Sequence, residues 1–320
     1  ELLGHKSPLF GRRTGQYQLE PMTFRQAAGF FPGRDPAWRV TAYAVFGGMP
    51  AYLALLAQEE DLEAAILNHV LAKGSVLFEE PRFLLSQELH QPAYYFAVLA
   101  AIAGGKTRLN EIVQAAGFTD RSAGSRYLDI LRALGLVERE VPVTELHPER
   151  SRRGIYRIRD PFLRFWFRFV WRHRTELETA GPSAVFRGLI APYLPEFTGS
   201  AFEEIARQHL AALAREGGLP FLPSRVGRWW NRDTEIDLVA LAPDEGELLV
   251  GEAKWRTSPV GLNVLRELEV KARALVAHST ALWRRPPRIH YVLFSRMGYT
   301  PDLRAHARRH GVRLVEVDEL

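Results

Sequence analysis

The sequence predicts a multidomain protein of mixed α and α/β class, in which a helical N-terminal half precedes a three-layer α/β domain with a mixed sheet. Three observations support this prediction. The chain has 320 residues with 47% hydrophobic content, which is enough for two or three cores. Helical periodicity dominates the first half, and strands alternate with helices after about residue 190. The expected segments are 1–85, 86–160, 161–190 and 191–320.

Composition restricts the chemistry that the chain can perform. It has no Cys, which excludes disulfides, thiolate zinc sites and cysteine nucleophiles and leaves carboxylates, Lys, His and hydroxyl groups. The formal net charge is +5 and most basic residues are Arg, so a nucleic-acid partner is permitted but not required. Nothing in the composition indicates an oligomeric state.

The first segment, 1–85, begins with Glu1 rather than Met, and "ELLGHKSPLFGRR" is typical of the middle of a domain. We therefore expect a fragment or a processed chain. The longest uncharged stretch, residues 40–58, is interrupted by Gly-Gly-Met-Pro at 47–50. This pattern predicts two soluble helices with a break rather than a membrane span, and the cytoplasm as the default compartment.

The second segment predicts three short helices, each stopped by glycine, followed by two alternating strands in "LVEREVPV" and "GIYRIRD". The helices are expected at 92–103, 109–116 and 120–134. Three helices and a two-stranded wing predict a winged helix-turn-helix. The stretch "AAIAGGKT" ends like a phosphate-binding loop, but it has Ala100 where that loop needs Gly, and a helical pattern precedes it.

The third helix of this unit is the candidate DNA-reading element. An apolar stripe is expected to be buried at Ala123, Tyr127, Ile130, Leu131 and Leu134. The helix would then present polar residues outward near its N-terminus, where such helices meet base edges, and the wing tip would add arginines. The candidate DNA-binding residues are Arg121, Ser122, Ser125, Arg126, Arg152 and Arg153, with Arg150 beside them. The alternative is a winged helix that only packs between domains, and the sequence leaves both open.

The third segment interleaves Arg with aromatic residues. Asp160 and Pro161 predict a helix start, with an apolar stripe and a solvent-facing basic stripe. The apolar stripe is Phe162, Phe165, Trp166 and Phe169, and the basic stripe is Arg164, Arg168 and Arg172. The alternative is a surface that binds a polyanion.

The last segment predicts the element order α-β-β-β-α-β-α-β, beginning with the helix in "GSAFEEIARQHLAALAREGG". The acidic residues Asp237 and Glu252 fall at the ends of adjacent meander strands, and Lys254 shares a strand face with Glu252. Two carboxylates side by side repel each other unless a hard cation joins them, so a magnesium ion is expected here. Such an ion could polarise a phosphodiester while Lys254 orients or deprotonates water.

The motifs "GSAFEE", "EID" and "GEAKW", on this order of elements, resemble the PD-(D/E)xK nuclease superfamily. The resemblance implies that Asp237, Glu252 and the Ala253 carbonyl bind Mg²⁺ or Mn²⁺, with Glu203 joining through water. It also implies that Lys254 assists the nucleophile. The proline that often precedes the aspartate is replaced by Ile236. A structural ion pair at a strand end is the alternative.

Almost the whole chain is also similar to the C-terminal part of the archaeal-type P-loop ATPases. The similarity lies in "SPLFGRRTGQYQLEPMTFRQAAGFFP", "GGMPAYL", the winged helix and "VGRWWNRDTEIDLVAL" with "GEAKW". It implies the end of an AAA-like ATPase domain and a helical lid remnant in residues 1–85, then a nuclease-like domain of unassigned function. Because the Walker motifs are absent, no ATP hydrolysis is expected, and the ATPase domain becomes a candidate partner.

These inferences predict DNA binding with Mg²⁺-dependent phosphodiester hydrolysis. The alternative is a non-catalytic regulator or protein-interaction module that uses the winged helix. The two differ in what happens to bound DNA when magnesium is added.

Overall fold

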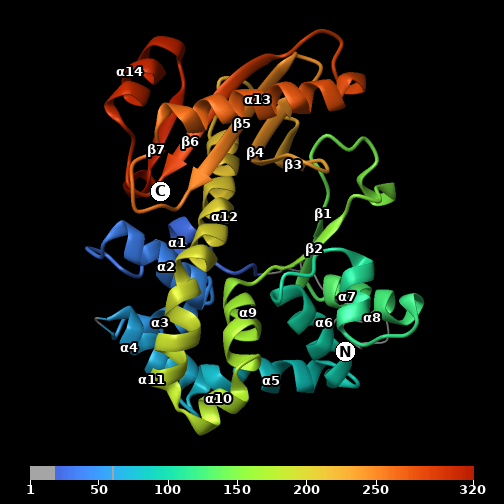
Figure 1. The fold of residues 1–320 in the computed structure, drawn as a ribbon, viewed down its shortest axis with the longest axis vertical. Coiled ribbons are helices and arrows are strands. Elements are labelled where there is room, and N and C mark those ends of the chain that lie inside the picture. The colour runs from blue at the N-terminus through green and yellow to red at the C-terminus, as the bar shows by residue number, and fades with distance from the viewer. Residues whose placement is uncertain (1–18, 60) are drawn as a thin grey trace, which may run out of the picture.

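The computed structural model describes residues 19–59 and 61–320. The segment quoted above as typical of a domain interior, and the first part of the ATPase-like motif, lie outside the described residues. A helical part and a part built on a five-stranded sheet lie one above the other, and the long helix α12 (Leu194–Arg215) runs through both (Figure 1). The chain is therefore a mixed α and α/β protein, as the sequence predicts.

The helices of the first segment form a compact cluster, and its central break is confirmed. A Cβ on Gly48 would lie 2.0 Å from the carbonyl oxygen of Met22, so only glycine fits between the two helices there. None of the described helices has the length and apolarity needed to cross a bilayer. The elements are α1 (Phe24–Ala28), α2 (Pro36–Phe46), α3 (Pro50–Leu56), α4 (Leu62–Ala65), the π-helical η1 (Ile66–Leu71) and α5 (Val76–Glu88).

Three helices and a small antiparallel sheet follow at the expected positions. They are α6 (Pro92–Ala103), α7 (Leu109–Ala115), α8 (Arg121–Ala133), β1 (Val137–Glu140) and β2 (Ile155–Ile158), with the short η2 (Pro148–Arg150) between the strands. The expected apolar stripe of α8 is only partly correct. Gly124, Leu128 and Leu131 are buried, whereas Ile130 and Leu134 are exposed. Gly124 lies against Val113, which turns this face of α8 toward α7.

The loop between β1 and β2 packs against the five-stranded sheet. Val143 donates its backbone N–H to the carbonyl of Arg228 at 2.9 Å, and Arg225 donates to the carbonyl of Glu145 at 2.9 Å. Both arginines belong to β3 (Arg225–Trp230), the edge strand of the sheet. The loop therefore satisfies one backbone carbonyl of the edge strand and is fastened to that strand by the Arg225 side chain.

The aromatic helix begins where the sequence predicts. The Asp160 side chain accepts a hydrogen bond from the Leu163 N–H at 2.8 Å, and Pro161 occupies the first turn. The four aromatic residues of the apolar stripe are buried, as expected. The basic stripe is wrong at Arg164, which is half-buried with its Nε enclosed, because it faces a cavity that α12 and β3 also line. The elements are α9 (Pro161–Phe165), η3 (Trp166–Trp171), α10 (Arg174–Thr179), α11 (Pro182–Val185), η4 (Phe186–Ile190) and η5 (Ala191–Tyr193).

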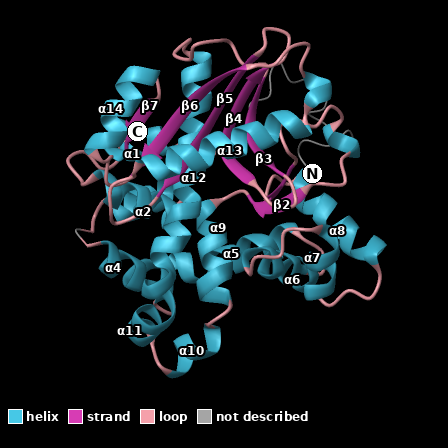
Figure 2. Ribbon diagram, turned by 45° about the horizontal axis from the view of Figure 1, so that its top comes forward, coloured by secondary structure: helices cyan, strands magenta, loops and turns pink. Residues whose placement is uncertain are grey.

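The sheet has the strand order β3-β4-β5-β6-β7, which is visible in Figure 2. The first three strands are antiparallel, and β6 and β7 run parallel to β5, so the mixed sheet is confirmed. Helix α12 covers one face and α13 the other, each above its own set of buried apolar residues. The remaining elements are β4 (Glu235–Ala242), β5 (Glu247–Lys254), α13 (Leu262–His278), η6 (Thr280–Leu282), β6 (Arg288–Ser295), α14 (Pro301–His310), β7 (Arg313–Glu316) and η7 (Val317–Glu319).

Candidate functional site

Asp237 and Glu252 lie on adjacent strands. The register of β4 and β5 runs to Leu238 and Gly251, and Asp237 and Glu252 are the next residues on the two strands. The Asp237 side chain accepts a hydrogen bond from the Ala253 N–H, which places it beside this end of β5. A Cβ on Gly251 would lie 2.6 Å from Val292, so glycine allows β5 to lie close to β6 immediately before Glu252. Adjacent strands therefore present two carboxylates side by side.

An irregularity in β4 occurs at Asp237. The paired positions run from Gly227 to Trp229 on β3, two residues, and from Val239 to Ile236 on β4, three residues. Strand β4 therefore carries one extra residue, a bulge that re-aims the local side chains. The carbonyl of Asp237 accepts a hydrogen bond from Arg207 of α12 at 3.4 Å. Helix α12 thus holds the irregular segment in place.

Glu252 is held by two lysines. Its side chain is 3% exposed; one carboxylate oxygen accepts a hydrogen bond from Lys254, and the other accepts one from Lys271 of α13 at 2.6 Å. Burial would raise the pKa of Glu252, but the two lysines outweigh burial and lower it. Glu252 is therefore ionised. Burial would likewise lower the pKa of Lys254, but Glu252 and Asp237 raise it, so Lys254 is a cation at neutral pH.

Asp237 has no such lysine partner. Its Oδ2 accepts the backbone N–H of Ala253 at 3.1 Å. Burial, then the nearby charges of Glu203 and Glu252, raise the pKa of Asp237 to about 7. The negative charge of this carboxylate is therefore only weakly compensated within the protein.

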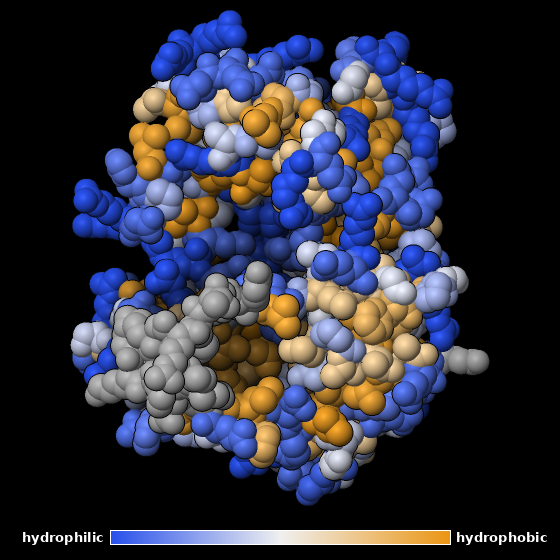
Figure 3. Space-filling model, turned by 180° about the vertical axis from the view of Figure 1, so that it is seen from behind, coloured by the Kyte–Doolittle hydropathy of each residue, from blue (hydrophilic) through white to orange (hydrophobic). Residues whose placement is uncertain are grey.

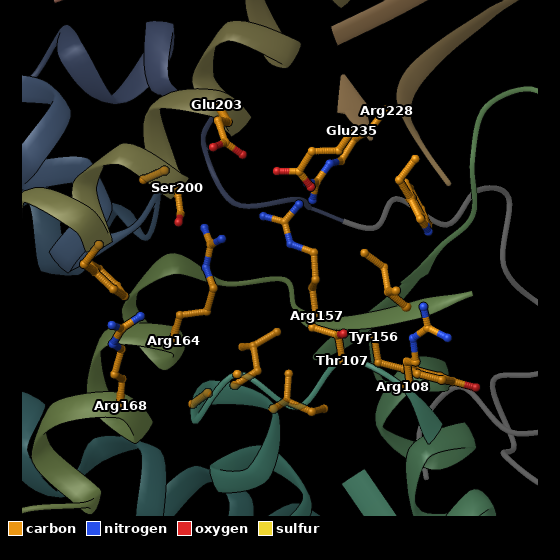
Figure 4. Close-up of a pocket in the computed structure, with 18 of the residues that line it drawn as sticks. Thr107, Arg108, Tyr156, Arg157, Arg164, Arg168, Ser200, Glu203, Arg228 and Glu235 are labelled. Carbon is orange, nitrogen blue, oxygen red and sulfur yellow. The ribbon is translucent and has the colours of Figure 1, made fainter. Parts of the chain in front are cut away.

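Glu203 lies on α12 beside this pair. Burial raises its pKa more than the neighbouring Arg228, Arg207 and Arg157 lower it. Figure 4 shows Glu203 pointing from α12 into a cavity on whose far side lie Arg157 and Arg164. The structure therefore brings together Glu203, Asp237, Glu252 and Lys254, which we call the carboxylate site.

The carboxylate site suits a hard divalent cation. Across residues 19–59 and 61–320, no three His, Asp or Glu side chains gather closely enough to hold a metal ion by themselves. Magnesium typically takes only one or two protein carboxylates and completes its shell with water and substrate phosphates. The buried Asp237, whose pKa is raised by like charges, is the donor that a cation would stabilise most. The donor set therefore fits Mg²⁺ or Mn²⁺.

The candidate DNA-binding residues of α8 lie on its outer surface. Arg121, Ser122 and Arg126 are exposed and Ser125 is half-buried. Ser122, Ser125 and Arg126 line a shallow groove along the helix. Asp120 caps the helix by accepting the backbone N–H groups of Ser122 and Ala123, so part of the polar capacity of Ser122 serves the cap.

The arginines of the β1–β2 loop differ from each other. Arg152 and Arg153 are both exposed, but Arg153 forms an ion pair with Glu145 at 3.0 Å. Since Glu145 lies in the segment packed against β3, Arg153 also fastens the loop to the sheet. The structure therefore keeps both interpretations of this loop, contact with DNA and packing between domains.

Sequence reasoning missed Lys271 and a group of arginines. Lys271 reaches Glu252 from α13, and one available signal was its rarity, since the chain has only five Lys. The arginines line a cavity of about 660 Å³ between β2, α9, α12 and the β3–β4 turn. We call this cavity the arginine pocket. Figure 3 shows a hollow lined by hydrophilic residues between the helical part and the sheet-containing part.

Comparison with known proteins gives relatives whose roles are undetermined. Residues 166–271 match the family DUF234, described as archaeal and bacterial proteins of unknown function. An uncharacterized protein of Methanocaldococcus jannaschii is 32% identical over 262 residues. This alignment covers 80% of the present chain and 56% of the relative, so the chain spans little more than half the length of that protein. The family match includes every residue of the carboxylate site and Lys271.

Proposed function

We propose that the chain is a DNA-binding, metal-dependent phosphodiesterase region of the PD-(D/E)xK type. The observation that carries this proposal is the closeness of Asp237 and Glu252 on the adjacent strands β4 and β5, with Lys254 on the same strand face as Glu252. The strand order and the helix α12 before β3 agree with the resemblance of the sequence to that superfamily. The carboxylate site would be catalytic and DNA the substrate.

The side chains have distinct roles in this proposal. Asp237, Glu252 and the Ala253 carbonyl would hold Mg²⁺ or Mn²⁺, and Glu203 would contribute through water. When bound, the ion supplies a Lewis acid that polarises the phosphodiester. Because the pKa of Lys254 is raised, its ammonium acts as a hydrogen-bond donor and a charge that offsets the developing negative charge on phosphorus. Lys271 keeps Glu252 ionised and oriented.

We further propose that residues 92–158 are a winged helix that positions the chain on DNA. Helix α8 would use Arg121, Ser122, Ser125 and Arg126, and the wing would add Arg152 and Arg153. The similarity of the sequence to archaeal-type P-loop ATPases makes an ATPase domain a proposed partner, with no ATP hydrolysis by this chain. In this proposal the region works in the cytoplasm.

The second candidate is a non-catalytic DNA-binding regulator or protein-interaction module. One observation favours it: both lysines of the site are engaged with Glu252, which is also how a structural ion pair at a strand end would look. In that case α8 and the wing would carry the activity and the sheet would serve as a platform.

Incubation with plasmid, linear and branched DNA, with and without Mg²⁺ or Mn²⁺, separates the two candidates. The nuclease proposal expects nicking or degradation that requires the metal and is lost in Asp237→Asn. Ca²⁺ should bind without supporting turnover, because it lacks the tight octahedral geometry of Mg²⁺. Wild-type protein that shifts DNA in a gel yet leaves every substrate intact with either metal would contradict the nuclease and favour the regulator.

A further inference from the structure

The arginine pocket has a strong excess of positive charge. Among the described residues, six arginines and three acidic residues line it. The arginines come from four separate parts of the chain: α9, β2, the start of α7, and β3 with the following turn. Folding therefore gathers like charges that repel one another, which proteins tolerate where an anion is bound.

Arg164 is the least compensated of these arginines. Its Nε is buried without a hydrogen-bond partner, and among the described residues its guanidinium forms no ion pair. Figure 4 shows the guanidinium groups of Arg164 and Arg157 pointing into the cavity toward Ser200 and Glu203. Burial and the charge of Arg157 lower the pKa of Arg164 to about 10. A buried N–H donor without an acceptor is costly, unless a ligand supplies the missing acceptor.

Three of the other five arginines of the pocket have protein partners. Arg157 pairs with Glu140 at 2.9 Å, Arg168 with Glu196 at 3.1 Å, and Arg228 with Glu235 at 3.5 Å. These pairs fix the guanidinium groups around the cavity, so they form a rigid rim about Arg164. The arrangement resembles a prepared anion site rather than a set of free surface charges.

The arginine pocket also has aromatic rings and a hydroxyl group, which are groups that can contact a nucleoside. The rings of Tyr156, Phe197 and Trp230 contribute to its wall, and the Ser200 side chain points into it from α12. Aromatic rings stack on bases regardless of their identity. The volume of about 660 Å³ lies within the range of small-ligand sites and far exceeds the space that one phosphate group occupies.

We propose that the arginine pocket binds one phosphorylated nucleoside unit, with the phosphate on Arg164 and Arg157 and the base against the aromatic wall. The unit is either a free nucleotide or the terminal nucleotide of a nucleic-acid strand. The pocket shares Glu203 with the carboxylate site, but its ligand requires no cleavage and no metal. This proposal can therefore be tested independently of the nuclease proposal.

The test is isothermal titration calorimetry of the full chain in EDTA, with four probes. The probes are AMP, inorganic phosphate, 5′-phosphorylated hexathymidylate and the same oligonucleotide without the phosphate. Arg164→Gln removes the charge that lacks a partner, and Arg308→Gln, on the exposed face of α14, is the control for loss of one positive charge. Each titration is repeated with both variants.

AMP or the phosphorylated oligonucleotide should bind at one site per chain, and Arg164→Gln should weaken that binding about 10- to 100-fold, as expected for a charged hydrogen bond. Arg308→Gln should leave it unchanged. Binding of AMP alone identifies a free nucleotide, and binding of the phosphorylated strand alone identifies a strand end.

Several results would overturn the proposal. One is no binding of either phosphorylated nucleotide probe. Others are inorganic phosphate binding as tightly as AMP, or equal losses in Arg164→Gln and Arg308→Gln. Because Arg164 lies half-buried beside other arginines and its Nε has no acceptor, Arg164→Gln should also raise the melting temperature of the ligand-free protein. That readout shows that the variant is folded, so weaker binding cannot be attributed to misfolding.

Discussion

The carboxylate site and the arginine pocket lie on either side of Glu203 and carry opposite charge excesses. In the first, Asp237 is buried beside two other carboxylates, and the nearby lysines are bonded to Glu252. In the second, Arg164 is half-buried beside other arginines, and the nearby carboxylates are bonded to its neighbours. Each region therefore has one poorly compensated charge inside a frame of satisfied ion pairs.

This contrast separates the residues that fix the geometry of a site from the residues whose charge a ligand would compensate. Ion pairs such as Lys271–Glu252 and Arg157–Glu140 fix the geometry, because both partners are partly desolvated and each would be costly alone. Asp237 and Arg164 contribute charge that the protein does not neutralise. We therefore propose a cation for one region and a phosphate for the other, and substitutions can separate the two roles.

The largest expected effect is on cleavage at the carboxylate site. Asp237→Asn removes one ligand charge while keeping the shape of the side chain and the acceptor for the Ala253 N–H. Metal-dependent cleavage should fall by about 10³-fold or more, a loss comparable to removing a principal electrostatic group from an active site. The measurement is the initial nicking rate with Mg²⁺. Asp244→Asn, in an exposed turn, is the matched control and should cleave at the wild-type rate.

An ion pair that fixes the geometry of a site should behave differently from Asp237 and Arg164, whose charges are poorly compensated. Although burial opposes it, Arg207 and Arg157 lower the pKa of Glu204 from 4.5 to about 2. Glu204→Gln should therefore destabilise the fold by about 2 kcal/mol at neutral pH, because two partly buried arginines lose charge compensation. The measurement is chemical denaturation.

The pH dependence checks this assignment. A carboxylate with a lowered pKa contributes stability that is complete above its unfolded value of 4.5 and is lost as pH falls toward 2. The stability difference between wild type and Glu204→Gln should shrink over that window. A difference that stays constant down to pH 2.5 would assign the effect to packing instead.

Substitutions of Lys254 test whether the carboxylate site requires its positive charge. Lys254→Ala should lower the cleavage rate about 10- to 100-fold, with a smaller effect on DNA affinity, as expected for a group that acts mainly in the transition state. Lys254→Arg should keep part of the rate, because the raised pKa of Lys254 makes it a cation rather than a base. Complete loss in Lys254→Arg, together with unchanged DNA binding, would favour proton transfer or strict positioning.

The smallest expected effect lies outside both regions, in the β1–β2 loop. Replacing Arg152 and Arg153 together by Gln should reduce the salt dependence of DNA binding by about 2 in the slope of log K against log salt, if each contacts one phosphate. Binding is measured by fluorescence anisotropy across a salt series. An unchanged slope, with a lower melting temperature from loss of the Arg153–Glu145 pair, would assign the loop to packing.

The sequence predicted the carboxylate site better than the arginine pocket, and the reason is physical. Asp237, Glu252 and Lys254 lie on neighbouring strands, where alternation and register alone bring side chains together. Lys271 was missed because its position depends on how α13 crosses the sheet, which no local pattern encodes. Periodicity and the positions of glycine predicted the order of helices and strands in the C-terminal part. The observed elements differ from the predicted ones by a few residues at their ends.

The pocket could not be predicted, because five separate segments of the chain line it. Periodicity placed Arg164 on a solvent face of the aromatic helix, and that inference is valid only if nothing covers the face. Helix α12 and the sheet do cover it. In α8 the same limit applies: Ile130 and Leu134 fit an apolar stripe, but α7 meets the helix at Gly124 instead. The bulge in β4 likewise has no local signature in "TEIDLVAL".

Divalent-cation binding tests the central claim most directly, because it requires neither a DNA substrate nor catalysis. Titration of Mn²⁺ into metal-free protein at pH 8, followed by calorimetry, should reveal one site that is lost in Asp237→Asn and kept in Asp244→Asn. Because Asp237 must lose a proton whose pKa is about 7, the affinity should fall when the pH is lowered from 8 to 6. Equal Mn²⁺ binding by wild type and Asp237→Asn would contradict the assignment of a cation to this site.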